Sequence, residues 1–237
     1  MAMVALLLLV IVLDAVVVAL PSGCEEGFIP WAWIKALNEI VLDEPWEDPV
    51  HSQKLPVQLL PWLWLSDQAS VELSMSGLHR LGITHVLSTN AMETHELEHM
   101  KSETERFGMQ HYVVNDHDED GYNNEGGYNM IENHWDKCRS FLQEVQESGG
   151  KVVIHYSGGI NRSGLIACAA LMVFEQRCVL DVVKFAKKKR FTLLTNRSFQ
   201  RQLCILAARE GLLGSKPDGF TDDPPSCRGP IDFGKFK

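Results

Sequence analysis

One stretch, Lys151–Phe174, constrains the fold of this chain more than any other, and it reads KVVIHYSGGINRSGLIACAALMVF. It begins with Val152–Ile154, a short β-branched apolar run that predicts a buried strand. It ends with Ser163–Phe174, an apolar run of helical length. Only the segment His155–Arg162 connects the two runs. The pattern therefore predicts a strand, a tight loop and a buried helix in direct succession.

The connecting loop has the composition of an anion-binding site. Gly158 and Gly159 permit backbone conformations and close approaches that a side chain would block. The backbone N–H groups of such a loop, together with the positive end of the following helix dipole, favour a bound anion. Arg162 adds a planar fork of donors that suits phosphate. These residues predict phosphate recognition.

The same loop resembles the protein tyrosine phosphatase signature His-Cys-x-x-Gly-x-x-Arg-Ser/Thr, in particular that of the dual-specificity phosphatases. His155, Gly159, Arg162 and Ser163 fall on positions of the signature, and Tyr156 stands where the family has its nucleophilic cysteine. The resemblance implies that the phosphate is bound by the residues after Tyr156, which are Ser157, Gly158, Gly159, Ile160, Asn161 and Arg162.

Three further stretches resemble the same family. PWLWLS at Pro61–Ser66 resembles the opening of the family's domain, and LGITHVLS at Leu81–Ser88 resembles a characteristic strand. RSFQRQL at Arg197–Leu203 resembles the closing helix. The resemblance covers Leu55–Leu213 and implies an α/β fold with a central mixed, mostly parallel sheet flanked by helices. The alternation of strand and helix patterns along the chain favours the same class.

In this family, a loop cysteine attacks phosphorus and forms a phosphocysteine. The resemblance implies that Arg162 clamps the phosphate, that Ser163 stabilises the leaving thiolate and that His155 orients the nucleophile. Without a thiolate, Ser163 would only cap the helix, and a buried structural role is the alternative for His155. Asn196 is implied to tie the last helices to the loop.

Asp116 is the candidate general acid, because it follows the predicted strand Gln110–Val114 in the V-x-D setting of the family. A carboxylic acid in this position would protonate the leaving oxygen. Asp118 and Asp120 are alternatives, and a solvated acidic turn is the interpretation without a catalytic role. A local duplication of Gly-Tyr-Asn at 121–123 and 127–129 lengthens the loop that carries these acids.

Tyr156 decides whether the family's chemistry can take place. A phenol has a pKa of about 10, so only about one in a thousand is ionised at pH 7. Its oxygen also lies much farther from the backbone than a cysteine sulfur does, so a phosphocysteine cannot form. The sequence therefore predicts a pseudophosphatase that binds phosphorylated ligands or scaffolds partners. One alternative is an active protein phosphatase, in which Tyr156 is an introduced or local change in a sequence whose relatives are catalytic. The other is a membrane-tethered interaction protein.

Charge and composition narrow the possible partners. The net charge of −9 argues against a general nucleic-acid binder, and a phosphorylated protein or peptide is the predicted partner. His95 and His99 lie four residues apart on a predicted helix, but they lack the rest of a ligand set. No metal and no cofactor is therefore expected. The six cysteines form no C-x-x-C pair, which favours free thiols and a cytoplasmic domain.

The remaining segments lie on either side of the predicted domain. Residues 1–20 are almost entirely apolar and predict a signal segment or membrane anchor, with a hydrophobic extension of a soluble protein as the alternative. Asp14 interrupts the run, and no Lys or Arg precedes Lys35. Residues 21–54 form a Trp-rich extension and linker, with a short helix that packs on the domain. Residues 55–213 form the phosphatase-like domain, and residues 214–237 a disordered tail. The basic run Lys187–Arg190 predicts a solvated helix face, with docking of an acidic partner or lipid headgroups as the alternative.

Overall fold

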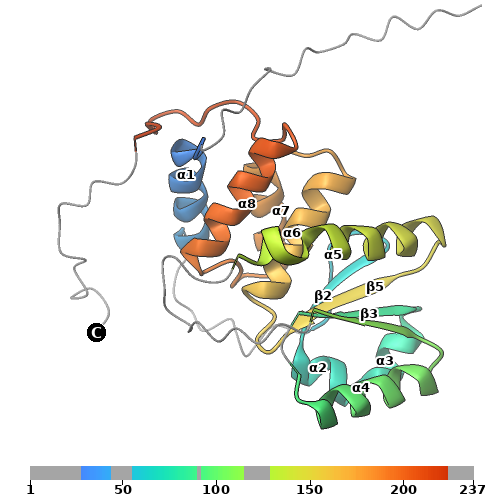
Figure 1. Ribbon diagram of the computed structural model, residues 1–237. Coiled ribbons are helices and arrows are strands. Elements are labelled where there is room, and N and C mark those ends of the chain that lie inside the picture. The colour runs from blue at the N-terminus through green and yellow to red at the C-terminus, as the bar shows by residue number, and fades with distance from the viewer. Residues whose placement is uncertain (1–27, 44–54, 90–91, 115–128, 224–237) are drawn as a thin grey trace, which may run out of the picture.

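The computed structural model describes residues 28–43, 55–89, 92–114 and 129–223, and its centre is a five-stranded sheet (Figure 1). The strands lie in the order β1-β2-β5-β3-β4. β1 pairs antiparallel to β2, and the other pairs are parallel. The prediction of a mixed, mostly parallel sheet is confirmed. The strands span Val57–Gln58 (β1), Leu63–Asp67 (β2), His85–Ser88 (β3), Gln110–Val113 (β4) and Val152–Tyr156 (β5).

Helices cover both faces of this sheet (Figure 1). One face carries α2, α3 and α4, and the other carries α5 and α6, with α7, α8 and α1 packed outside them. The two cores between these layers are apolar and separate. The helices span Trp31–Leu42 (α1), Gln68–Leu73 (α2), Met75–Arg80 (α3), Thr94–Arg106 (α4), Met130–Glu147 (α5), Arg162–Phe174 (α6), Val179–Lys189 (α7) and Arg197–Arg209 (α8).

Helix α6 is the central helix of the larger core. Every residue from Ser163 to Val173 is buried, which explains why its sequence is apolar all round rather than on one stripe. It packs against the strands β2 and β5 and against three neighbouring helices. Burying the whole helix fixes its N-terminus, and with it the loop that connects β5 to α6.

Helix α1 belongs to the same core, as the sequence predicts. Ala32 and Leu37 are fully buried, and the helix packs on α7 and α8. Lys187 of α7 donates hydrogen bonds from Nζ to the carbonyl oxygens of Ile40 (2.8 Å) and Val41 (2.6 Å). These bonds satisfy carbonyls that the end of a helix leaves without intrahelical partners.

The prediction that Lys187–Arg190 forms a solvated face is wrong for its first and last residues. Lys187 is 6% exposed and Arg190 only 1%, whereas Lys188 and Lys189 are exposed. The reason is that α7 turns one side toward α1 and its C-terminal end toward the β5–α6 loop. A run of like charges says nothing about which members face inward, because that depends on the neighbouring elements.

The C-terminal part of the described chain is more ordered than the sequence predicts. Disorder is predicted from Gly214 onward, but the structure packs Phe220 against the main core and bonds Lys35 of α1 to Thr221 and Asp223. Among the described residues, no helix has the length and apolar character needed to cross a bilayer. The predicted anchor at residues 1–20 lies outside the described residues.

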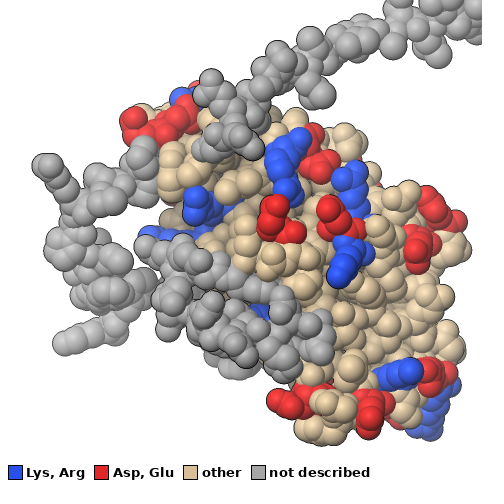
Figure 2. Space-filling view, viewed as in Figure 1, with Lys and Arg blue, Asp and Glu red and all other residues tan. Residues whose placement is uncertain are grey.

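Charged side chains are mixed on the face of the molecule shown in Figure 2. Lys and Arg alternate there with Asp and Glu, and among the residues drawn in colour neither sign forms a broad patch. Helix α4 carries His95 and His99, which are both exposed. No cluster of three or more potential metal ligands occurs in the part of the chain that the structure describes.

Candidate phosphate-binding site

The candidate site lies where the parallel strands end. Tyr156 is the last residue of β5, in register with Asp67, the last residue of β2. The preceding residue, His155, is in register with Ser88, the last residue of β3. In parallel α/β sheets, ligands bind in the crevice outside the carboxyl ends of the strands. The β5–α6 loop is therefore placed at the edge where binding sites of this architecture occur.

The loop is pressed against the end of β2. Gly159 has φ +62°, and a Cβ built on it would lie 2.6 Å from the carbonyl oxygen of Ser66 and 2.9 Å from the backbone nitrogen of Asp67. The N–H of Gly159 donates to the carbonyl oxygen of Tyr156 (3.0 Å). A side chain at position 159 is thus incompatible with both the backbone conformation and the available space.

Arg190, which the sequence predicts to lie on a solvated helix face, instead supports the β5–α6 loop through hydrogen bonds. Its guanidinium donates from Nη2 to the carbonyl oxygen of Gly158 (3.0 Å) and from Nε to that of Gly159 (3.4 Å). Burial lowers the pKa of Arg190, and the neighbouring Asp67 opposes this shift. No local pattern predicts this role, because Arg190 is 31 residues away from Gly159 in the chain.

The far side of the loop is tied to the segment before α8. Asn161 accepts hydrogen bonds at Oδ1 from the backbone N–H of Asn196 (3.0 Å) and from Oγ1 of Thr195 (3.2 Å). Ile160 accepts from the N–H of Leu194 (3.1 Å). Asn196 caps α8 by accepting from the N–H of Ser198 (2.8 Å). The structure thus brings Asn161 and Asn196 together, and hydrogen bonds hold the loop on both sides.

Arg162 and Tyr156 face each other across the loop. The guanidinium carbon of Arg162 lies 5.2 Å from the centroid of the Tyr156 ring, which is a cation–π contact. Both residues are half-buried. Arg162 is also the first residue of α6, whose N-cap residue, Asn161, makes no side-chain capping bond. The positive dipole end of α6 thus lies beside the Arg162 guanidinium, and both favour a bound anion.

Comparison with known families identifies this fold. A family model described as "Dual specificity phosphatase, catalytic domain" matches residues 63–208, more than half of the chain. The chain belongs to the dual-specificity phosphatase family. The matched region runs from the first residue of β2 almost to the end of α8, so it contains strands β2 to β5, the β5–α6 loop and the segment that holds Asn161.

Relatives of known name support this assignment. Dual specificity protein phosphatase 2 of Mus musculus is 32% identical over 164 residues, covering 67% of this chain and 45% of that protein. Dual specificity protein phosphatase 5 of Rattus norvegicus is 29% identical over 189 residues, covering 76% of this chain and 42% of that protein. The chain thus spans less than half the length of these two curated relatives.

Solved structures of the family share the fold. DUSP15 aligns with a TM-score of 0.54 at 23% identity, covering 67% of this chain and 91% of that one. The human tyrosine phosphatase-like serine/threonine/tyrosine-interacting protein aligns with a TM-score of 0.52 at 22% identity, covering 65% and 96%. The phosphatase-like arrangement of layers is therefore common to this chain and to both structures.

Behind the phosphatase-like loop, two histidines share one buried hydroxyl. Oγ of Ser88 lies 2.6 Å from Nε2 of His155 and 2.7 Å from Nε2 of His111. Burial, and to a lesser extent the neighbouring His111, lower the pKa of His155 to about 3, although Asp67 opposes the shift. Burial lowers the pKa of His111 to about 4. Both rings are neutral at pH 7, and since Ser88 has one proton, it donates to one ring and accepts from the other.

Stability should fall on mild acidification because of these two histidines. Below about pH 6.5, the ordinary pKa of histidine, the two histidines bind protons in the unfolded chain but remain neutral in the folded chain. The free energy of unfolding therefore decreases as the pH falls. The slope for one fully buried histidine is about 1.4 kcal/mol per pH unit, or about 2 kcal/mol between pH 6.5 and 5. Urea denaturation at pH 7.5, 6.0 and 5.0 measures this slope. The variant His155→Gln should show a shallower slope, and an unchanged slope would contradict the assignment to His155.

Ser163 does not cap α6, because Asn161 occupies the N-cap position. Its hydroxyl is buried and has no hydrogen-bond partner among the described residues. The neighbouring Gly164 allows α6 to approach Leu193, since a Cβ there would lie 2.7 Å from a methyl carbon of that side chain. The alternative prediction, that Ser163 caps the helix, is therefore wrong.

The remaining predicted site residues are Ser157 and the candidate general acids. Ser157 is exposed, and its carbonyl oxygen accepts from the N–H of Gln68 (3.4 Å). Asp116, Asp118 and Asp120 lie outside the described residues, which end at Val114 after β4 and begin again at Asn129. Their part in the site stays a prediction.

Proposed function

We propose that this chain is a dual-specificity phosphatase-fold protein that binds a phosphorylated protein or peptide without forming a phosphocysteine. The observation that carries the proposal is the residue at the end of β5. Tyr156 stands there, directly before the loop, and the Arg162 guanidinium lies over its ring. The proposed phosphate-binding residues are those of the loop from Ser157 to Arg162, and Tyr156 takes the place of the nucleophile.

Three of the four described cysteines are too deeply buried to supply a nucleophile in its place. Cys138 and Cys168 are buried, and burial raises the pKa of each to about 12. Burial raises the pKa of Cys204 still further. Reactive cysteines have lowered pKa values in electropositive, partly exposed places. Three of the four described cysteines are thus in the inert class, and the fourth, Cys178, is the N-cap residue of α7.

Two features of the loop support the proposed phosphate binding. The start of α6 offers N–H groups and a positive dipole end, and Arg162 offers a guanidinium at the same point. A cation–π contact is worth about 0.5–2 kcal/mol. A hydrogen bond to a charged group contributes about 1.5–3 kcal/mol, and a bidentate guanidinium–phosphate pair makes two. A bidentate pair between Arg162 and a phosphate is therefore worth more than the cation–π contact alone.

Binding of matched peptides tests this proposal. Isothermal titration calorimetry with a phosphotyrosine peptide, a phosphothreonine peptide and their unphosphorylated counterparts should show binding of at least one phosphorylated form. The variant Arg162→Ala should lose at least about tenfold in affinity, since a charge-assisted pair is removed. Arg177→Ala is the matched control, because it removes a similar cation–π contact, 4.9 Å from Phe185, away from the loop.

Phosphate release from the same peptides distinguishes this function from that of an active phosphatase. The unmodified chain should release phosphate no faster than Arg162→Ala. Turnover clearly above that variant would favour an active enzyme. Equal affinity for phosphorylated and unphosphorylated peptides would rule out phosphate recognition by the loop.

A further inference from the structure

A groove formed by residues far in sequence from the β5–α6 loop has no role in the proposed function. This groove of about 570 Å³ runs between the second half of α1, the first turns of α7 and the described part of the tail. Its apolar lining includes Ile40 and Leu42 of α1, Leu180 of α7 and Phe220 of the tail. Glu39 of α1 and Asp43, the C-cap residue of that helix, add two carboxylates, and Lys184 of α7 adds one cation, so the lining keeps a negative excess. Leu42 is 64% exposed.

The wall of this groove is firmly held. Lys187 binds the last carbonyl oxygens of α1, at Ile40 and Val41, and fixes the C-terminal end of that helix to α7. An exposed leucine on a fixed wall keeps its apolar surface in water, which is unfavourable in proportion to the area. The groove therefore presents apolar surface that a bound apolar segment would cover.

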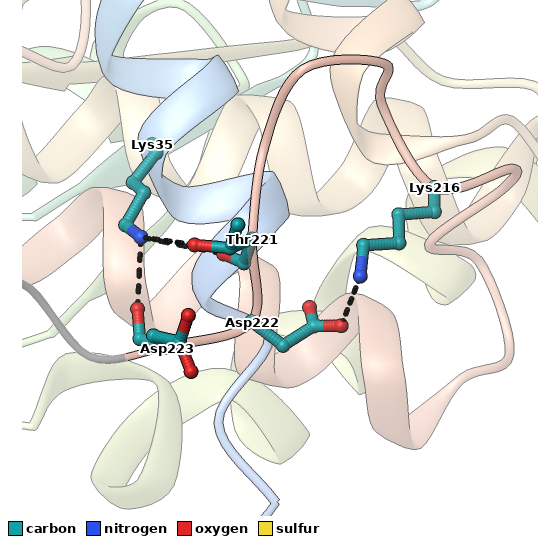
Figure 3. Close-up of polar contacts among 5 residues, drawn as sticks. All are labelled: Lys35, Lys216, Thr221, Asp222 and Asp223. Atoms are coloured by element: carbon teal, nitrogen blue, oxygen red, sulfur yellow. Dashed lines mark hydrogen bonds and ion pairs between the residues drawn. The ribbon is translucent and has the colours of Figure 1, made fainter.

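The described chain ends beside this groove (Figure 3). Lys35 of α1 donates from Nζ to the carbonyl oxygens of Thr221 (3.3 Å) and Asp223 (2.8 Å) and to Oγ1 of Thr221 (3.3 Å). Lys216 pairs with Asp222 within the tail. Lys35 immediately precedes Ala36, which lines the groove. Residues 224–237 therefore start from a point fixed to the same helix that forms the groove wall.

The sequence of residues 224–237, PPSCRGPIDFGKFK, complements the groove. Its apolar residues Ile231, Phe233 and Phe236 lie close together near the end of the chain. Three cations, Arg228, Lys235 and Lys237, outnumber the one acidic side chain, Asp232, and would face the carboxylates of the groove. Fourteen residues span up to about 46 Å when extended, so reach is not limiting.

The apolar N-terminal run fits the same groove less well. Its only charged side chain is Asp14, which Glu39 and Asp43 would repel. It joins the described chain before α1, whereas the groove lies along the second half of that helix. Twelve residues of α-helix are about 18 Å long, and the run would have to cross this length as well as the intervening segment.

We propose that the C-terminal segment, residues 224–237, folds back onto the groove between α1 and α7. Its apolar side chains pack against Ile40, Leu42 and Leu180, and its lysines lie near Glu39 and Asp43. Tethering next to the site gives an effective concentration on the order of millimolar, so even a weak intrinsic affinity of about 0.1 mM keeps the groove about 90% occupied. The inference does not depend on phosphate binding.

Hydrogen–deuterium exchange on the full chain tests the docking. The double variant Phe233→Ser, Phe236→Ser should exchange the amides at the end of α1, residues 39–43, about tenfold faster than the unmodified chain, because it loses the protection of a bound segment. Leu42→Glu should have the same effect. Leu81→Glu is the matched control, since Leu81 is 40% exposed and lies outside the groove. Equal exchange in the unmodified chain and the double variant would overturn the proposal.

A photo-crosslink identifies the occupant. With p-benzoylphenylalanine in place of Phe233 in the full chain, illumination should join the tail to peptides that contain residues 36–43 or 180–184 of the same molecule. Glu39→Lys combined with Asp43→Lys should lower the yield, whereas Glu98→Lys on the exposed side of α4 should not. Crosslinks only between two molecules, or to other parts of the chain, would overturn the proposal. So would a loss of α1 protection on deleting residues 1–20 but not on deleting 224–237.

Discussion

Replacing Tyr156 with cysteine is expected to raise the rate of p-nitrophenyl phosphate hydrolysis by on the order of a thousandfold, because covalent catalysis by a positioned nucleophile supplies factors of this size or more. The substitution removes the ring that lies under the Arg162 guanidinium and places a thiol at the end of β5. The start of α6 and Arg162 then act on that thiol. A helix N-terminus and a neighbouring cation lower a thiol pKa from its usual value of about 8.5.

Two variants separate the effect of the thiol from that of an emptied pocket. Tyr156→Ser removes the ring without supplying a thiolate and should remain at the rate of the unmodified chain. Tyr156→Cys combined with Arg162→Ala should lose most of the gain. The pH dependence of alkylation by iodoacetamide measures the pKa of the new thiol, which we expect below 8. No gain in hydrolysis from a thiol of lowered pKa would mean that another part of the active site, such as the proposed acid Asp116, is not functional.

Gly159→Ala is expected to destabilise the protein by about 2–4 kcal/mol and to abolish phosphate binding. A side chain at φ +62° costs about 1–2 kcal/mol. The added Cβ would also lie 2.6 Å from the carbonyl oxygen of Ser66, and backbone atoms cannot move aside as a flexible side chain can. The loop must therefore leave β2, which also disturbs the bonds from Arg190 to its carbonyl oxygens.

The neighbouring glycine is the control for this prediction. A Cβ on Gly158 would meet only the side chain of Ile160, at 3.6 Å, which is ordinary van der Waals contact. Gly158→Ala should therefore change the free energy of unfolding by about 0.5 kcal/mol or less, as is usual away from strained or packed positions. Urea denaturation of both variants at pH 7.5 provides the comparison. Similar stabilities for the two variants would show that the contact of Gly159 with β2 is unimportant.

Local patterns in the sequence were sufficient to predict the elements that carry the site. The apolar run Val152–Ile154 lies in β5, and the continuous apolar run after the loop forms α6. Asp67, an aspartate directly before α2, accepts a hydrogen bond at its side chain from the N–H of Ser70 (2.7 Å). Gly82, which follows the C-cap residue of α3, has φ +76°. Each of these properties depends on residues a few positions apart, and short-range preferences decide such features.

The supports of the loop could not be predicted in the same way. Arg190 reaches the carbonyl oxygens of Gly158 and Gly159 because α7 ends beneath the loop, and Asn161 meets Asn196 because α8 begins beside it. These partners lie 31 to 35 residues apart in the chain. In a sequence, a buried arginine that bonds to carbonyl oxygens and a solvated arginine on a helix look the same.

The sequence by itself determined the family, the strand–loop–helix and the presence of Tyr156 and Arg162 in one loop, because each is written in consecutive residues. The tertiary structure alone decided that Arg162 lies over the ring of Tyr156 and that His155 and His111 share the hydroxyl of Ser88. It alone decided that Lys187 and Arg190 are buried. The physical reason is that burial, and the hydrogen bonds that make burial of a charge tolerable, arise only when separate elements pack together.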